Sequence, residues 1–155
     1  MDESSLVRND IRYYQERHCC VQWRRFLGVL FTGLADGGGT DTLVAFFRSL
    51  GRDMARELPV AEQDSLEGLE AAINVHWATM DWGWCRLSAS DSAIRIVHGA
   101  WPRVPCRQPE LAGEAMAALV SGAYQQWLEE QGGAALEVTP LRMDQDGPIE
   151  LCYGC

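Results

Sequence analysis

Apolar residues recur every three to four positions along three segments of the first half of the chain, which predicts three helices that each bury one face. The first covers residues 22–35, and a glycine-rich break follows it. The second begins at Thr40, which can cap it, and ends before Pro59. The third begins with Asp64 and Glu67, which have capping-box spacing. The apolar face of the first helix comprises Trp23, Phe26, Leu27, Leu30, Phe31 and Leu34.

Residues 1–21 carry only a weak amphipathic pattern among many charged side chains. We expect this segment to form an N-terminal arm or helix. Residues 22–155 are long enough to form one domain with its own core.

After Met80 the period of the apolar pattern changes from about 3.6 to 2, which predicts a strand. In this strand Trp82 and Trp84 point to one side, and Cys85 points to the other. The polar turn SASDS leads into a second alternating run that reaches His98. The two runs together predict a hairpin.

A helix over residues 110–131 and a second hairpin around the turn DQDG complete the chain. The predicted order is N-terminal helices, a hairpin, a long helix and a hairpin. This order indicates an α+β fold, with an antiparallel sheet of two hairpins and the long helix between the hairpins.

The chain of 155 residues has a formal net charge of −9, and arginine supplies all 13 of its basic residues. An acidic body argues against nucleic acid or an anionic membrane as a partner, since both need a basic surface. Residues 24–35 have the basic flank and apolar core of a signal peptide, but they begin late and carry the helical apolar face. We expect a core helix, no membrane insertion and a cytoplasmic location.

The sequence carries no motif of a catalytic serine, a phosphate-binding loop or a zinc protease, so we expect no enzyme activity and no cofactor. Cys152 and Cys155 have the spacing of redox and zinc sites. They end a predicted strand, whereas redox pairs open helices, so we expect no metal and six reduced cysteines. His76 and His98 are expected to be structural.

Three short motifs stand in the middle of the chain. They comprise Leu50, Gly51, Arg52, Met54 and Ala55, then Asn74, Met80, Trp82 and Gly83, and then Ile96, Val97, His98 and Pro102. Their combination and spacing resemble the bacterial cellulose synthase operon protein D family, and the similarity extends from about Gln22 to the end of the chain. Residues 1–21 and the C-terminal Cys-Tyr-Gly-Cys have no counterpart in this resemblance.

The resemblance implies a non-catalytic accessory subunit of a bacterial cellulose synthesis and secretion complex. Such a subunit assists the ordered export or crystalline bundling of β-1,4-glucan chains, assembles with itself into an octamer built from dimers, and contacts other subunits of the complex. The helices over residues 22–35 and 110–131 are the candidate interfaces. The motif residues expected to be structural are Gly51, Arg52, Asn74, Trp82, Gly83, His98 and Pro102.

The N-terminal segments of this family are associated with glucan, and the residue types found here suit such a contact. Arginines supply permanent hydrogen-bond donors for sugar hydroxyls, and aromatic rings supply flat apolar faces for glucose. The candidate glucan-binding residues are Arg8, Arg12, Tyr13, Tyr14, Arg17 and Trp23. The alternative is an exposed or partner-binding helix.

Two other functions remain open. A weaker similarity to the four-vinyl-reductase-like fold implies a small-ligand-binding domain, with an apolar pocket between helices and sheet. A thiol or metal enzyme would use Cys85, His98, Cys152 or Cys155.

Overall fold

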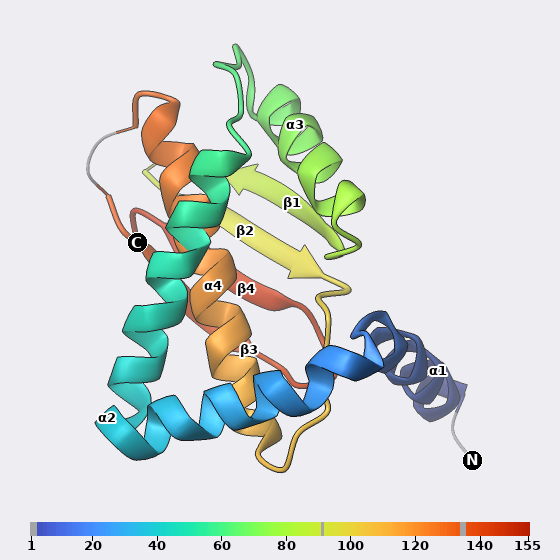
Figure 1. The fold of residues 1–155 in the computed structure, drawn as a ribbon. Coiled ribbons are helices and arrows are strands. Elements are labelled where there is room, and N and C mark those ends of the chain that lie inside the picture. Colours follow the sequence, from blue (N-terminus) through green and yellow to red (C-terminus); the bar gives the residue numbers. More distant parts are fainter. Residues whose placement is uncertain (1–2, 91, 134–135) are drawn as a thin grey trace.

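The computed structural model describes residues 3–90, 92–133 and 136–155. In this part of the chain, helices and strands follow the predicted order (Figure 1), which confirms the α+β fold. The elements are α1 (Glu3–His18), α2 (Val21–Glu57), α3 (Leu66–Thr79), β1 (Trp84–Ala89), β2 (Ile94–Gly99), α4 (Pro109–Glu130), β3 (Val138–Met143) and β4 (Ile149–Tyr153).

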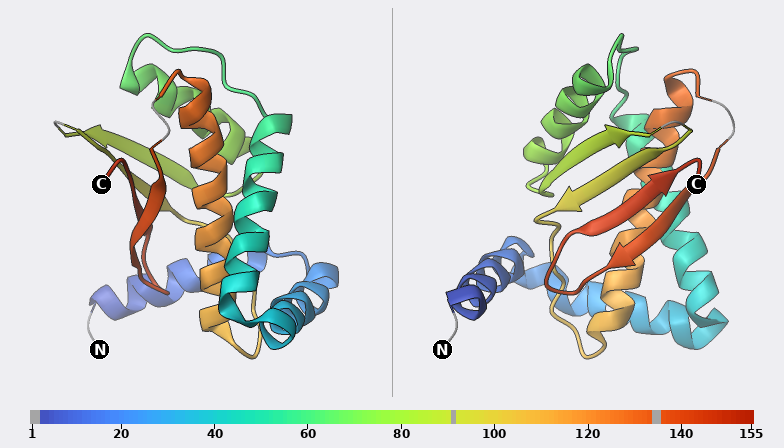
Figure 2. Two further views of the ribbon diagram at one scale, coloured as in Figure 1. Left: turned by 90° about the vertical axis from the view of Figure 1, so that its left-hand side faces the viewer. Right: turned by 180° about the vertical axis from the view of Figure 1, so that it is seen from behind.

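The strands form one antiparallel sheet in the order β1-β2-β4-β3. Each hairpin pairs two consecutive strands, and α4 connects the hairpins so that β4 lies beside β2. α3 and α4 cover one face of the sheet, while the opposite face carries no helix of the described residues (Figure 2). The main core therefore lies between these helices and the covered face.

β3 forms one edge of the sheet and is irregular. Its register with β4 shifts between Pro140 and Arg142, which leaves Leu141 in a β-bulge. Pro140 also lacks the N–H group that a further strand would need. The sheet therefore ends at β3.

α2 consists of two helical halves that meet at a sharp kink (Figure 1), which confirms the two helices that the sequence predicts on either side of the glycine-rich stretch. The bend lies at Gly39, whose φ of 80° and ψ of 173° are not helical. The residues just before Gly39 remain helical. The side-chain hydrogen bond beside the kink comes from Thr42, whose hydroxyl group donates to the carbonyl oxygen of Gly38. The second half of α2 therefore begins where the sequence predicts, but the non-helical residue at its start is Gly39 rather than the expected cap Thr40.

α3 begins one residue after Ser65, whose extended backbone is that of a capping residue. The Ser65 hydroxyl oxygen accepts a hydrogen bond from the N–H of Gly68 at 3.0 Å. The predicted capping box of Asp64 and Glu67 is wrong, because Ser65 takes the capping position.

α2 and α4 pack closely because each has a glycine at their contact. A methyl group at Gly51 would overlap the carbonyl group of Leu119, and one at Gly122 would overlap the carbonyl group of Arg48. Only residues without a side chain allow the two backbones to approach this closely.

α4 is the central helix of the molecule and is buried along nearly its whole length. Its exposed residues lie at its two ends and are Pro109, Glu110 and Glu130. The candidate interface over residues 110–131 is therefore wrong, because this helix is already covered by α2 and by the sheet.

Candidate functional site

His98 lies in a buried hydrogen-bond network. Its Nε2 is 2.9 Å from the carbonyl oxygen of Trp82, which can only accept, so Nε2 carries the ring proton. Nδ1 therefore accepts a hydrogen bond from the hydroxyl group of Tyr124 at 2.6 Å. The Tyr124 oxygen in turn accepts a hydrogen bond from Nε1 of Trp77 at 3.0 Å. Both ring nitrogens of His98 are thus satisfied inside the protein.

Burial sets the charge of the groups in this region. It lowers the pKa of His98 to about 4, so the imidazole is uncharged at neutral pH. It raises the pKa of the Cys85 thiol to about 12, so Cys85 is not a reactive thiolate. Both side chains are buried from water and from any substrate. This arrangement stabilises the core and lacks the accessible base or nucleophile of a reaction centre.

Trp82 and Trp84 do not share one side of a strand, so that prediction is wrong. β1 begins only at Trp84, and Gly83 before it has a φ of 90°. Trp82 stacks on Trp77 in the interior, with ring centres 6.2 Å apart, whereas Trp84 is 47% exposed. A side chain at Gly83 would collide with the carbonyl group of Gly99, so glycine is required here.

Asn74 closes the outer edge of β1. Its side-chain oxygen accepts a hydrogen bond from the N–H of Cys85 at 2.7 Å, and its amide group donates to the Cys85 carbonyl oxygen at 2.9 Å. Glu70, one turn earlier in α3, accepts a hydrogen bond from the N–H of Leu87 at 2.7 Å. These side chains satisfy backbone groups that otherwise pair with a further strand.

The remaining motif residues also make contacts within the chain. Arg52 on α2 forms an ion pair with Glu129 on α4, with 2.6 Å between Nη2 and Oε2. Pro102 is half-buried in the connection between β2 and α4. Together with Gly51, these residues join the helices to each other and to the sheet.

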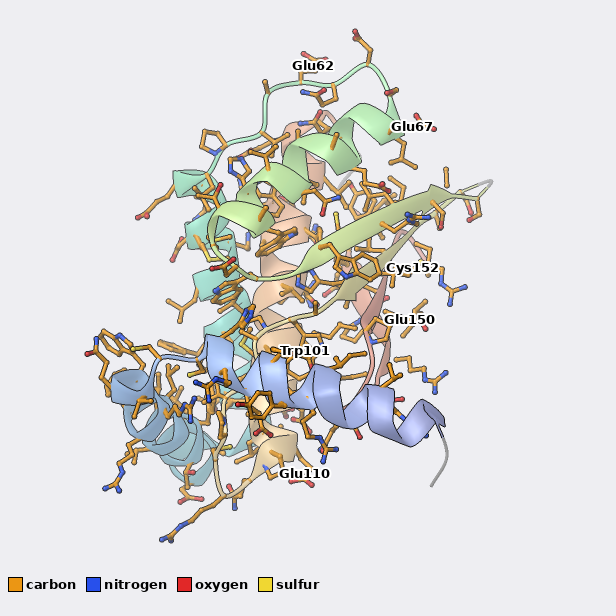
Figure 3. All side chains as sticks on the ribbon, turned by 90° about the vertical axis from the view of Figure 1, so that its right-hand side faces the viewer. Glu62, Glu67, Trp101, Glu110, Glu150 and Cys152 are labelled. Atoms are coloured by element: carbon orange, nitrogen blue, oxygen red, sulfur yellow. A yellow bond between two sulfur atoms is a disulfide. The ribbon has the colours of Figure 1, made fainter. Side chains whose placement is uncertain are left out.

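α1 lies beside the connection between β2 and α4 (Figure 3) and is attached through polar side chains. Nη2 of Arg12 lies 2.5 and 2.7 Å from the two carboxylate oxygens of Asp146, in the β3–β4 turn. Nε of Arg103 donates to the side-chain oxygen of Gln15 at 3.0 Å. The Arg12 hydrogen bonds lower the pKa of Asp146, and the charge of the exposed Arg8 lowers it further. Arg12 is therefore occupied by a structural ion pair.

The other candidate glucan-binding residues lie on two separate helices. Tyr13 and Tyr14 are exposed on α1 with ring centres 5.6 Å apart, and the guanidinium carbon of Arg17 is 5.4 Å from the Tyr13 ring centre. Trp23 lies on α2, where its ring centre is 5.8 Å from that of Phe26. The structure thus presents two exposed aromatic pairs rather than one continuous aromatic strip.

The first half of α2 buries much less of its apolar face than the sequence predicts. Only Phe31 of that face is buried, while Trp23 and Phe26 are each more than half exposed. The physical reason is that this half-helix lies at the periphery of the molecule (Figure 1), where its apolar stripe is wider than its contact with the core. The exposed apolar residues of α1 and of this half-helix are Val7, Ile11, Tyr13, Tyr14, Val21, Trp23, Phe26 and Val29.

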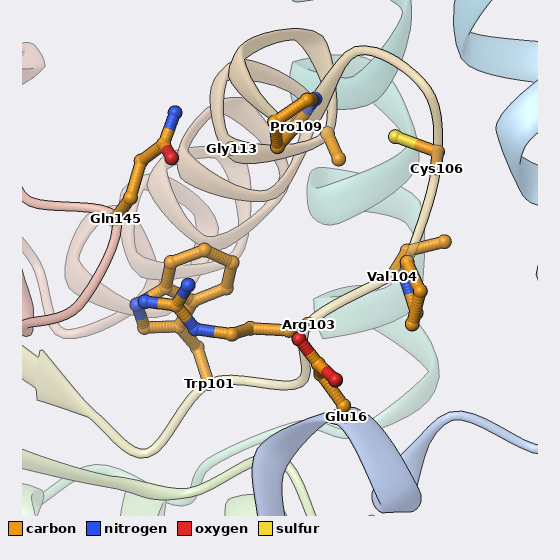
Figure 4. A pocket seen from close by; sticks show the side chains of 10 residues that line it. Glu16, Trp101, Arg103, Val104, Cys106, Pro109, Gly113 and Gln145 are labelled. Carbon is orange, nitrogen blue, oxygen red and sulfur yellow. The ribbon is translucent and has the colours of Figure 1, made fainter. Parts of the chain in front are cut away.

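A cavity of about 210 Å³ lies between α1 and the start of α4 (Figure 4). The guanidinium carbon of Arg103 is 5.1 Å from the ring centre of Trp101, which is buried and donates Nε1–H to the carbonyl oxygen of Gly147. Polar side chains of Glu16 and Gln145 also line the cavity. This is not the apolar pocket between helices and sheet that a small-ligand-binding domain requires.

Cys152 and Cys155 form a disulfide, with their Cα atoms 5.9 Å apart. The expectation that all six cysteines are reduced is therefore wrong. Gly154 between them has a φ of 86°, which turns the chain back at the end of β4. The free cysteines are Cys19, Cys20, Cys85 and Cys106.

Within residues 3–90, 92–133 and 136–155, no cluster of histidine, cysteine or acidic side chains could hold a metal ion. In the same part of the chain, no helix combines the length and the apolar character needed to cross a membrane.

Comparison with known proteins gives one consistent result. The family model that describes the D subunit of cellulose synthase matches residues 9–154. Two relatives named cellulose synthase operon protein D, from Komagataeibacter xylinus and Komagataeibacter sucrofermentans, are each 31% identical to the chain over 111 residues, which is 70% of the chain and 70% of the relative. The family match begins well before Gln22, so it includes most of α1, which had no counterpart in the resemblance based on the three motifs.

Proposed function

Because the chain belongs to the cellulose synthase operon protein D family, we propose that it is a non-catalytic accessory subunit of a bacterial cellulose synthesis and secretion complex. In this proposal it assists the ordered export or crystalline bundling of β-1,4-glucan chains and does not form the glycosidic bond. The match over residues 9–154 is the observation that carries the proposal.

The surroundings of the motif residues support a non-catalytic role. His98 is neutral and buried, and both of its ring nitrogens are engaged. Cys85 is a buried thiol with a strongly raised pKa. A general base or nucleophile must reach its substrate, and neither side chain can do so. The motif is thus better explained by packing than by chemistry.

The proposed assembly is a homo-oligomer, with an octamer built from dimers as the expected size. Its support is the exposed apolar surface of α1 and of the first half of α2. Trp23 and Phe26 are 52% and 56% exposed, and Val29 is 72% exposed. Neighbouring large apolar groups of this kind mark interaction surfaces. We assign self-association to these two helices, and the contacts with other subunits of the complex to surfaces outside them.

The proposed glucan contact is the N-terminal segment, in which Tyr13 and Tyr14 offer exposed rings, while Trp23 is assigned to the contact between copies instead. Arg8 and Arg17 are exposed donors for sugar hydroxyls, while Arg12 orients α1 through Asp146. Each ring contributes about 1 kcal/mol by analogy with aromatic pairs. Binding therefore depends on many copies acting together on one glucan chain.

We further propose that residues 1–21 act as an arm on a single domain formed by residues 22–155, and that the assembly works in the cytoplasm. The Cys152–Cys155 disulfide is an observation against the cytoplasm, because disulfides persist mainly in oxidising compartments. Fractionation of cells expressing a tagged chain, compared with marker proteins of each compartment, distinguishes the two locations.

Gene deletion in the host bacterium tests the accessory role. Membranes of the deletion strain should polymerise glucan at the normal rate, while secreted cellulose should fall in yield and in its crystalline fraction by X-ray diffraction. Loss of polymerisation in those membranes would contradict the proposal. So would hydrolysis of cello-oligosaccharides by the purified protein, if one carboxylate substitution abolished it.

A further inference from the structure

The uncovered face of the sheet carries a tryptophan that lies flat on the backbone. Trp84 at the start of β1 pairs with Gly99 at the end of β2. A methyl group at Gly99 would overlap the indole ring of Trp84, at atoms Cζ2 and Cε2. The absence of a side chain at Gly99 therefore lets the ring rest directly on the strand, with its other face toward solvent.

The Trp84 ring has no partner among the described residues. It forms no aromatic pair with them, its Nε1–H makes no hydrogen bond to them, and the side chain is 47% exposed. The other tryptophans of β1 and its surroundings differ, because Trp82 stacks on Trp77 and Trp101 lies beneath Arg103. Trp84 thus combines a fixed orientation with a free ring face and a free donor.

Arg86 extends the same face two residues along β1. It is exposed and makes no hydrogen bond or ion pair within the described part of the chain. Val97 lies opposite it on β2, and Glu150 on β4 follows in the same row. Glu150 is neutralised by an ion pair with Arg95. The face therefore presents the flat ring of Trp84 and the unpaired guanidinium of Arg86, beside the ion pair of Arg95 and Glu150.

We propose that this face is a second glucan-contact surface, in which Trp84 stacks on the apolar face of a glucose ring and Arg86 donates hydrogen bonds to sugar hydroxyls. The proposal rests on the accessory role in cellulose secretion. A glucose ring has axial C–H groups on its faces and hydroxyls around its rim, which matches a flat ring with donors beside it.

Other occupants fit this face less well. An acidic partner would require several unpaired cations, whereas Arg95 is paired with Glu150 and Arg142 lies 3.8 Å from Asp144. A second copy of the chain would need roughly 800 Å² on each partner with an apolar centre. The large apolar residues suited to that contact lie on α1 and α2 instead.

The position of Trp84 is consistent with a glucan path that starts at α1. Trp84, Gly99 and the β3–β4 turn all lie at the same end of the sheet. Arg12 of α1 is bound to Asp146 in that turn. Across the sheet, β1 and β3 are three strand spacings apart, roughly 14 Å. α1 is therefore attached at the same end of the sheet as Trp84.

Titration of the full-length protein with cellopentaose tests this inference. The indole N–H signal of Trp84, assigned by its loss in Trp84→Ala, should shift, and Trp84→Ala should weaken binding by about fivefold, the effect of one lost stacking contact. Trp84→Phe should retain most of the affinity, and Arg86→Gln should weaken binding more than Arg107→Gln, a change of another exposed arginine. Thermal unfolding should be the same for all of these variants.

Three outcomes would overturn the inference. If the wild type binds cellopentaose and Trp84→Ala binds equally well, the sheet face is not a contact, while the N-terminal glucan contact stands. If the wild type shows no shift at millimolar cellopentaose, both glucan contacts fail. If Trp84→Ala changes the number of subunits in native mass spectrometry, this face joins copies of the chain and does not bind glucan.

Discussion

His98 and Tyr124 are joined by a hydrogen bond of 2.6 Å, from the phenol group to Nδ1, in the interior of the protein. Tyr124 also accepts a hydrogen bond from Trp77. One phenol group on α4 thus connects the sheet to α3. Such a network stabilises the fold only while every member keeps its partner.

We expect Tyr124→Phe to destabilise the protein by roughly 2 to 4 kcal/mol, because it leaves His98 Nδ1 and Trp77 Nε1 without partners in the core. Urea unfolding followed by circular dichroism measures the change. Tyr14→Phe is the matched control, since Tyr14 is 64% exposed, and it should have no effect. Equal stability of the two variants would show that the network does not support the core.

Stability should fall as the pH is lowered from about 6.5 toward 4. Burial lowers the pKa of His98 from 6.5 to about 4, so the unfolded chain binds the proton more readily than the folded one. The contribution of neutral His98 to the free energy of unfolding is fully present above pH 6.5. It is lost as the pH approaches 4, and the total loss is about 3 kcal/mol. Urea midpoints between pH 7 and 4 measure it, and His98→Gln should remove this component of the slope.

Gly51→Ala and Gly33→Ala should change stability in opposite directions. Alanine at Gly51 would overlap the Leu119 carbonyl group and should cost about 1 to 3 kcal/mol. Alanine at Gly33, which has open space around it, should stabilise the helix by up to about 1 kcal/mol. Thermal unfolding compares the two variants, and equal tolerance would refute the close contact between α2 and α4.

Replacing Trp23 and Phe26 together by aspartate should reduce the assembly to smaller species, because charges would enter the proposed contact between copies. Native mass spectrometry counts the subunits. Leu141→Asp is the control, since Leu141 is similarly exposed but lies on β3. A wild-type protein that is monomeric at micromolar concentration would remove the basis of the proposed assembly.

The unfolded, unreduced protein should react with four equivalents of a thiol reagent per chain, because Cys152 and Cys155 are bonded to each other. Prior reduction should raise this number by two. Cys152→Ser with Cys155→Ser should cost little stability, because the bond closes only a short loop near the chain end. Six reactive thiols before reduction would instead support six reduced cysteines.

The elements with a clear period could be predicted from the sequence. The hairpin through His98, the second hairpin and the long helix were predicted correctly, since their apolar spacing reflects which side faces the core. Gly51, a motif residue expected to be structural, lies at the close contact between α2 and α4.

The errors occurred where a single residue or a distant element decides the structure. The glycine-rich stretch correctly predicts a break between two helices, but it does not predict that the non-helical backbone is confined to one residue, Gly39. The apolar stripe of residues 22–35 does not predict how many of its side chains are buried against the core. The positive φ of Gly83 moves Trp82 and Trp84 to different environments, and the turn at Gly154 brings two cysteines together. None of these effects changes the period of the pattern.

Asn74, Glu70 and Pro140 lie at the two edges of the sheet, where a further strand would otherwise pair. The outer backbone groups of β1 are taken up by side chains of α3, and β3 has a proline and a bulge on the opposite edge. Exposed sheet edges are templates for amyloid-like growth, and here both are blocked. If the protein acts in many copies beside an elongating polymer, as proposed, these blocked edges would keep neighbouring copies from joining their sheets into aggregates.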